Sequence, residues 1–261
     1  MDTTDSFERR PFPRARRLTT DVGHLAADRP AIRGLLEIDV TEPRRRIRAL
    51  REATGERLSF TAYLAACAGH AVDAHPRVHA CRDWLGRLVT FDDVDISTRI
   101  EVERDGHRFP VGHIVRAANR KAVQPIHEEI RAVQSAPTSE KNVNRLMASG
   151  RLPAFLRRLV LRAIERSPTW SKRLKGTVVL TSVGMFGKGA GWGIALPTHS
   201  LGITVGGIAR KPWCVDDRIE PRDILHVTLE FDHDVVDGAP AARFAQFFAE
   251  TVESGELLED V

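Results

Sequence analysis

The alternation of apolar and polar residues near the C-terminus predicts a β-strand that ends at a histidine. In the stretch HVTLEFDH, residues 226–233, one face at a period of two reads Val227, Leu229, Phe231 and His233. A histidine on the apolar face of a half-buried strand must satisfy two ring nitrogens, and it is more often a hydrogen-bonded core residue than a catalyst. The pattern alone therefore leaves both roles open for His233.

Periodicity predicts alternating helices and strands along most of the chain. Helices are expected where apolar residues recur every three to four positions, and strands where short apolar runs end at turn residues. The expected helices are 41–54, 59–74, 123–134, 152–166 and 238–252, and the expected strands are 32–40, 88–91, 94–102, 176–184, 201–208 and 226–231. The first thirty residues, rich in arginine and proline, read as irregular. This order favours an α+β fold, with helices on one side of a mixed sheet.

The expected helix at 152–166 differs from the others in its charge. It has an apolar stripe and carries Arg157, Arg158, Arg162 and Arg166 elsewhere. A helix packed on its own domain with a solvated basic face would show this pattern, and so would a partner surface, a membrane-surface contact or a guide for an anionic substrate. We therefore divide the chain into a leader at 1–30 and one domain at 31–261, with a basic amphipathic insertion at about 137–175.

Composition narrows the class of protein without naming a function. The 261 residues are 42% hydrophobic and 28% charged, which is typical of a soluble globular domain. The N-terminus lacks the apolar core of a signal peptide, so a cytoplasmic location is expected. Three widely spaced cysteines, Cys67, Cys81 and Cys214, form no metal-type pair. The net charge is +4, yet no nucleic-acid-binding motif accompanies the basic clusters, so no nucleic-acid partner is expected.

Several motifs together resemble one enzyme family. FDHDVVDGAPAARF is similar to the D-H-x-x-x-D-G-A-x-A-A-x-F signature of the catalytic domain of 2-oxo acid dehydrogenase acyltransferases, which belong to the chloramphenicol-acetyltransferase-like superfamily. Upstream, GTVVLTSVGMFG resembles the family's G-T-F-T-I-S-N-L-G-M-F-G segment, and VRAANRKAVQPIHEEIR resembles one of its helices. The matches occur in family order and span nearly the whole chain. The resemblance implies a mixed sheet flanked by helices, and a homotrimer with active sites between subunits.

The resemblance also implies roles for individual residues. His233 would be the general base that takes a proton from the acceptor, since an imidazole titrates near neutral pH. Thr181 matches the position of the family's oxyanion donor. Strand alternation places Thr181 and its neighbour Ser182 on opposite faces, so only one of them should face the site, and Ser182 is the second choice.

The acid of the same signature has a structural role in the family. Asp237 precedes Gly238 and the closing helix, so its carboxylate could also cap that helix. The resemblance implies that Asp237 braces the site by pairing with an arginine of the N-terminal segment. The candidates here are Arg16 and Arg17.

Some residues depart from the family pattern. Asp234 replaces the arginine that usually follows the histidine, HRFPVGHIV replaces an apolar segment, and the basic insertion replaces a short loop. In the insertion, Arg157, Arg158 and Arg162 are candidates for contacting CoA phosphates or an anionic carrier. No lipoyl or subunit-binding domain precedes the catalytic part of the sequence, which favours a stand-alone form.

These features lead to one preferred function and two alternatives. We expect direct transfer of an acyl group, most simply acetyl, from acyl-CoA to a hydroxyl of a small-molecule or carrier-bound acceptor, as stand-alone relatives do in some polyketide pathways of secondary metabolism. Acyl-CoA would be a co-substrate, with no permanently bound cofactor and no metal. The alternatives are a dihydrolipoyl acyltransferase that acts on a lipoyl domain in another chain, and a catalytically degenerate structural or partner module.

Overall fold

The computed structural model describes residues 8–104, 106–135, 153–183 and 189–259. The helices are α1 (Arg14–Ala27), α2 (Thr41–Thr54), α3 (Phe60–Ala74), α4 (Val123–Ser135), α6 (Ala154–Arg166), α7 (Pro168–Lys175) and α8 (Gly238–Ser254). The strands are β1 (Ala31–Asp39), β2 (Cys81–Arg82), β3 (Leu88–Val89), β4 (Ile96–Arg104), β5 (His107–Val115), β6 (Val178–Ser182), β7 (Leu201–Val215) and β8 (Arg218–Asp232). Short 3₁₀ turns lie at Pro76–His79, Ala118–Arg120 and Glu256–Leu258.

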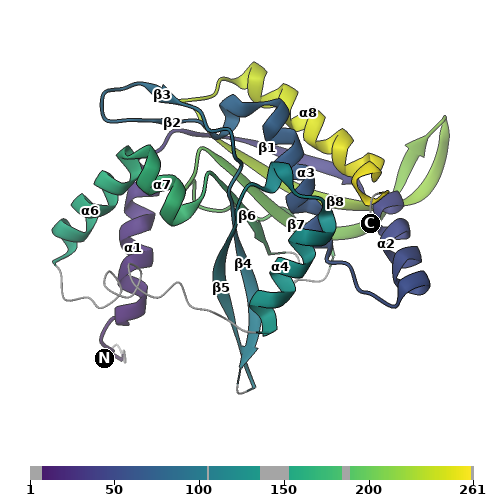
Figure 1. The fold of residues 1–261 in the computed structure, drawn as a ribbon, viewed down its shortest axis with the longest axis horizontal. Helices are drawn as coiled ribbons and strands as arrows, with labels where there is room; N and C mark the ends of the chain where they lie inside the picture. The colour runs from purple at the N-terminus through teal and green to yellow at the C-terminus, as the bar shows by residue number, and fades with distance from the viewer. Residues whose placement is uncertain (1–7, 105, 136–152, 184–188, 260–261) are drawn as a thin grey trace, which may run out of the picture.

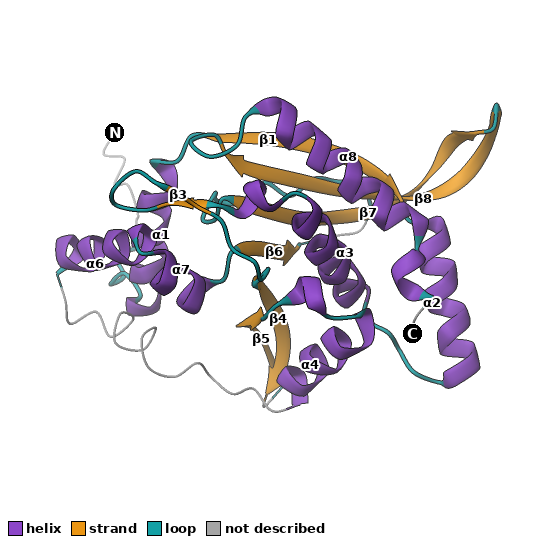
Figure 2. Cartoon of the chain, turned by 45° about the horizontal axis from the view of Figure 1, so that its top comes forward, coloured by secondary structure: helices purple, strands orange, loops and turns teal. Residues whose placement is uncertain are grey.

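A mixed sheet forms the centre of the molecule, with strand order β1-β8-β7-β6-β4-β5 in the described residues. Strands β4, β6 and β7 run parallel to one another, and the other neighbours are antiparallel. Helices α3, α4 and α8 lie on the same side of this sheet (Figure 2). Phe244 and Phe248 of α8 are fully buried there, together with Ile203 and Leu229 of the central strands. The expected fold class, a mixed sheet flanked by helices, is confirmed.

Strand β8 is buried on both faces over the part that leads to the candidate histidine. Residues 224–232 are all buried, because β8 lies between β1 and β7 and both of its faces are covered. The prediction of a half-buried strand was therefore wrong. Thr228, Glu230 and Asp232 occupy the face that the pattern assigned to solvent. A period-two pattern reports side-chain chemistry, and it does not show that a polar face is covered by other parts of the chain.

The N-terminal segment contains a helix that the composition concealed. The expectation of an irregular leader was wrong for residues 14–27, which form α1. This helix packs against α6 of the basic insertion (Figure 1). Its partner is distant in the sequence, so the local arginine-rich pattern gave no sign of the apolar face that the contact buries. The first part of the expected insertion, 137–152, lies outside the described residues.

Ion pairs join α1 to α6. The Nε of Arg157 lies 2.6 Å from Oδ2 of Asp21, and the Nε of Arg158 lies 3.1 Å from Oδ1 of the same carboxylate. Arg157 is only 5% exposed and Asp21 1% exposed. A third pair, between Arg162 and Asp28 at 3.1 Å, lies at the surface. The buried pair therefore fixes how the insertion sits on the N-terminal helix, because each buried charge depends on the other.

Replacing Arg157 should destabilise this part of the fold. The change Arg157→Ala leaves the carboxylate of Asp21 buried without its main partner, which should lower the free energy of unfolding by about 3 kcal/mol. Urea denaturation followed by circular dichroism measures this loss. The matched control is Arg162→Ala, which removes an exposed pair and should cost less than about 1 kcal/mol. Equal losses in the free energy of unfolding for the two variants would contradict the stabilising role of the buried pair between Arg157 and Asp21.

Candidate functional site

His233 lies in an exposed turn directly after β8. The strand ends at Asp232, and the backbone N–H of His233 donates to the carbonyl of Pro30 at 2.7 Å. The backbone N–H of Asp234 donates to Oδ1 of Asp232 at 3.1 Å, which turns the chain towards α8. The prediction that His233 continues the apolar face was wrong, because the strand stops one residue earlier and the His233 side chain is exposed. The ring is thus held by a fixed backbone and remains accessible.

Asp232 connects this turn to a chain of alternating charges. Its Oδ2 lies 3.2 Å from Nη1 of Arg29, and Nη2 of Arg29 lies 3.4 Å from Oε1 of Glu165. Glu165 lies in turn 3.3 Å from Nζ of Lys175. Burial raises the pKa of Asp232, and the charge of Arg29 opposes this effect. Burial also lowers the pKa of Lys175, against the pull of Glu165. The four charges therefore neutralise one another in a poorly solvated place.

Thr181 and Ser182 occupy opposite faces of β6, as the alternation predicted. Thr181 pairs in register with Thr204 of β7, and Thr204 pairs in register with Thr228 of β8. The hydroxyls of Thr204 and Thr228 are buried and have no hydrogen-bond partner within the described part of the chain. Ser182 is level with Val205 and lies on the face that α3 and α8 cover. Thr181 therefore belongs to a polar row on the face away from these helices.

The sheet register keeps Thr181 and His233 apart within one chain. Thr181 is level with Thr228, five positions before His233, and β6 is separated from β8 by β7. A strand rises about 3.3 Å per residue and neighbouring strands are about 4.8 Å apart, so the two residues are on the order of 20 Å apart. A single chain does not bring the two candidate catalytic groups into contact.

Asp237 is the residue before the first turn of α8. Its carbonyl accepts from the N–H of Ala241 at 3.1 Å, but its carboxylate makes no capping hydrogen bond. In the regions that the structure describes, Asp237 makes no ion pair, so the implied brace by Arg16 or Arg17 is not seen within one chain. Both arginines lie in the first turn of α1. The N-terminal arginine that does reach the signature is Arg29, and its partner is Asp232.

A cavity of about 410 Å³ lies beside the turn that carries His233, between the insertion and the end of β8. Its wall includes Asp232 and Asp234 but not His233 or Thr181. Helices α1, α6 and α7 and the β2–β3 hairpin supply the other walls. Of the three arginines expected to contact an anion, Arg162 lines the cavity, whereas Arg157 is buried against Asp21. The insertion therefore does form a pocket next to the signature.

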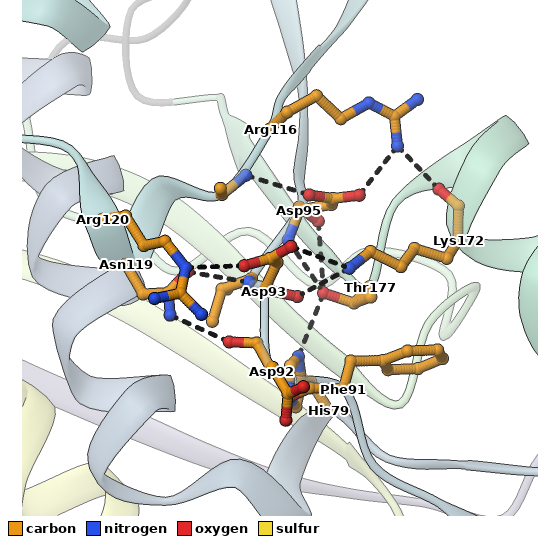
Figure 3. A network of polar contacts seen from close by, with 12 residues as sticks. His79, Phe91, Asp92, Asp93, Asp95, Arg116, Asn119, Arg120, Lys172 and Thr177 are labelled. Atoms are coloured by element: carbon orange, nitrogen blue, oxygen red, sulfur yellow. Dashed lines mark hydrogen bonds and ion pairs between the residues drawn. The ribbon is translucent and has the colours of Figure 1, made fainter.

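A polar network supports one side of this cavity (Figure 3). The carboxylate of Asp95 accepts from Arg116 at 2.8 Å and from the N–H of Ala117 at 3.0 Å. The backbone of Asp95 joins Thr177, whose hydroxyl lies 3.0 Å from Nδ1 of His79. Gly176 makes this approach achievable, since a Cβ there would lie 2.7 Å from the carbonyl oxygen of Asp95. The network fixes His79 and Thr177 in the cavity wall.

Two buried histidines in the same wall are held neutral. Burial lowers the pKa of His79 to about 4 and that of His199 to about 3. In each ring one nitrogen faces a backbone carbonyl, that of Phe91 for His79 and that of Lys175 for His199. The other nitrogen faces a threonine hydroxyl. Each ring thus donates one hydrogen bond and accepts one, which suits a neutral imidazole with a structural role.

Sequence reasoning missed several residues of this region. Arg29 was assigned to an irregular leader, and Glu165 and Lys175 were treated only as part of a basic insertion. Asp232 was visible, because it flanks the histidine in the motif FDHD. Nothing in the spacing showed that these groups, up to 203 positions apart, would meet.

The described part of the chain meets the requirements of neither a metal site nor a membrane-spanning helix. The described residues contain no group of three or more histidine, cysteine, aspartate or glutamate side chains placed to hold a metal ion. None of the helices that the structure describes is long and apolar enough to cross a membrane.

The sequence matches one family model and several curated proteins. Residues 141–259 match the model of the 2-oxoacid dehydrogenases acyltransferase catalytic domain. The chain is 27% identical, over 183 residues, to the dihydrolipoyllysine-residue acetyltransferase component of the pyruvate dehydrogenase complex of Zymomonas mobilis subsp. mobilis, which covers 70% of this chain and 34% of that protein. It is 23% identical, over 228 residues, to the dihydrolipoyllysine-residue succinyltransferase component of the 2-oxoglutarate dehydrogenase complex of Staphylococcus saprophyticus subsp. saprophyticus. This match covers 85% of this chain and 46% of that protein. The chain thus spans less than half the length of these relatives.

Solved structures show the fold. The dihydrolipoamide acetyltransferase of Azotobacter vinelandii, studied for the roles of a serine, a histidine and an asparagine in its mechanism, has a TM-score of 0.72 at 17% identity, covering 98% of this chain and 95% of that one. The cubic core of a pyruvate dehydrogenase multienzyme complex also gives 0.72, at 16% identity and the same coverage. Chloramphenicol acetyltransferase has a TM-score of 0.52 at 14% identity, and the match covers 94% of this chain and 95% of that one. The fold is therefore chloramphenicol-acetyltransferase-like, as expected.

The two buried histidines predict how stability depends on pH. Their folded pKa values lie below the ordinary value near 6.5, so the unfolded chain binds more protons as the pH falls below that value. The contribution of these two histidines to the free energy of unfolding should be fully present above about pH 6.5. It should decline as the pH falls towards 4. Urea titrations at pH 7.5 and pH 5 measure how much the free energy of unfolding falls between these pH values. This fall should be about 2 kcal/mol smaller for His199→Gln than for the unmodified protein.

The exposed His107 provides the control for this measurement. His107→Gln should leave the pH dependence unchanged, because its side chain is exposed on β5. The same pH dependence in the His199→Gln variant as in the unmodified protein would show that His199 is not held neutral by burial.

Proposed function

We propose that the chain transfers an acyl group directly from acyl-CoA to a small or carrier-bound acceptor, because residues 141–259 match the model of the 2-oxoacid dehydrogenases acyltransferase catalytic domain and the curated relatives are acyltransferase components. His233 takes the proton from the acceptor hydroxyl or thiol, and the acceptor atom attacks the thioester carbonyl. The tetrahedral intermediate then expels the CoA thiolate, which recovers the proton from the imidazolium. No acyl-enzyme forms: the acyl group ends on the acceptor, and the proton ends on the CoA thiol.

The observation that carries this proposal is the position of His233. Its ring is exposed, while its backbone is fixed by Pro30 and by the turn at Asp232. A general base must reach its substrate and must also be aimed, and this turn meets both requirements. The histidine and asparagine studied in the Azotobacter vinelandii enzyme are four positions apart, as are His233 and Asp237.

Thr181 is our candidate for stabilising the oxyanion. Its hydroxyl lies on the face of the sheet away from the core helices, and its side chain is only partly buried. Since one chain holds Thr181 on the order of 20 Å from His233, we infer that each site combines His233 of one copy with Thr181 of another. A homotrimer is the assembly that we expect, and a multimeric core in a solved relative supports self-association.

The nature of the acceptor distinguishes two versions of the proposal. The cavity beside the turn has a volume suited to a small molecule, which favours a small hydroxyl-bearing acceptor. The second version is a dihydrolipoyl acceptor on a separate domain, which the names of the relatives favour. Transfer from acetyl-CoA to dihydrolipoamide, with none to any alcohol, would select the second version.

Removing the base tests the shared mechanism. His233→Ala should reduce turnover with acetyl-CoA by about two to four orders of magnitude, because proton transfer then depends on water. Mass spectrometry of the acylated acceptor measures the rate, and His107→Ala is the matched exposed control. A folded His233→Ala variant with unchanged turnover would refute the assignment. Binding of CoA by the unmodified protein, without turnover on any acceptor, would instead indicate a degenerate module.

A further inference from the structure

The charges around the cavity do not cancel completely. Four acidic groups line it, and each has a basic partner in the same wall: Asp232 with Arg29, Glu165 with Lys175, Asp234 with Arg82, and Asp28 with Arg162. Two further cations, Arg166 and Lys172, also line the cavity. The wall therefore carries an excess of positive charge.

These two cations are poorly compensated. Arg166 has no acidic partner in residues 8–104, 106–135, 153–183 and 189–259. The Nζ of Lys172 donates to the backbone carbonyl of Asp93 at 3.3 Å and lies 3.8 Å from its carboxylate, which is held more closely by Arg120 at 2.7 Å. Both cations belong to the two helices of the insertion, α6 and α7. The positive charge of Arg166 and Lys172 would attract an anion into the cavity.

Apolar side chains form another part of the wall, which opens to solvent and also contains polar side chains such as His79, Thr177 and Ser200. Leu25 and Phe91 line the interior, and Leu159 and Trp84, which also line the cavity, are 61% and 73% exposed. Leu159 and Trp84 therefore offer apolar surface to a ligand in the cavity. The lining thus suits a ligand with an apolar body and one anionic group. The several phosphates of CoA would need more positive charge than two cations supply.

The cavity also ends within reach of the proposed base. Asp232 and Asp234, the residues on either side of His233, both line it. Consecutive Cα atoms are about 3.8 Å apart, so the backbone of His233 lies directly beside the lining of the cavity.

We propose that this cavity binds the acyl acceptor, and that the acceptor is a small organic carboxylate with an apolar chain. Its carboxylate lies between Arg166 and Lys172, its chain lies against Leu159 and Phe91, and its hydroxyl or thiol extends past Asp234 to His233. The inference rests on the proposed acyl transfer, because it assigns the acceptor half of that reaction.

Matched acceptors that differ in one charge test the inference. Dihydrolipoate and dihydrolipoamide share the same thiols, and 6-hydroxyhexanoate and 6-hydroxyhexanamide share the same hydroxyl. With acetyl-CoA as donor, the acid of at least one pair should have a kcat/KM about tenfold higher than its amide, since a charge-assisted hydrogen bond contributes about this much. The double variant Arg166→Gln, Lys172→Gln should remove the preference by raising KM for the acid.

The control is Arg173→Gln, on the same helix as Lys172 and with the same loss of charge. Arg173 does not line the cavity, and its side chain lies over the ring of Trp170. This variant should keep the preference for the acid. Circular dichroism spectra that match the unmodified protein establish that both variants are folded.

The possible failures are distinguishable from one another. Equal use of acid and amide would overturn the acceptor assignment while the acyl transfer stands. A double variant with a raised KM for acetyl-CoA alone would assign the cations to the donor phosphates and would also overturn it. If no acceptor is acylated, the proposed function fails, and calorimetry with the oxidised pair, lipoate and lipoamide, tests the carboxylate site apart from the reaction. Binding of lipoate that the double variant weakens would support a carboxylate site in this cavity, and equal binding of both compounds would overturn it.

Discussion

The pairing of Arg29 with Asp232 is the interaction on which the candidate site depends. Asp232 ends the buried strand β8, and its carboxylate receives both the guanidinium of Arg29 and the N–H of Asp234. Its carbonyl also accepts from Val235 and Val236, so one residue closes the turn that presents His233. Because the carboxylate is buried, it needs the charge of Arg29, and that arginine follows α1. The N-terminal helix, the insertion and the turn that carries His233 are thereby joined.

The sheet imposes a second constraint. Its register fixes Thr181 and His233 at distant positions of the same chain, and no rotation of a side chain closes a gap on the order of 20 Å. In the proposed reaction, Thr181 with the threonine row beside it is one half of the active site, and the exposed ring of His233 is the other half. Two copies of the chain can supply both halves to one substrate, which makes assembly a condition of catalysis in this account.

The elements that were predictable are those whose signals are local. Helix α2 runs from Thr41 to Thr54 as predicted, because it begins with an acid and a proline in its first turn and ends at Gly55 in a left-handed conformation. Helix α1 was missed because its stabilising contact with α6 joins Asp21 to Arg157, 136 positions away. The exposure of His233 was missed because the alternation continued through Asp232, while the turn depends on a hydrogen bond between residues two positions apart. The alternation did separate Thr181 from Ser182 correctly, since that is a property of the strand alone.

The most direct test of the account is to mix two inactive chains. A His233→Ala chain and a Thr181→Ala chain, each with its own affinity tag, are co-expressed, and assemblies that carry both tags are isolated. If the site is shared between copies of a trimer, one of the three sites in each mixed trimer contains both groups, and activity with acetyl-CoA should return well above that of either variant alone. Mixed assemblies that form but remain as inactive as the separate variants would contradict the shared site.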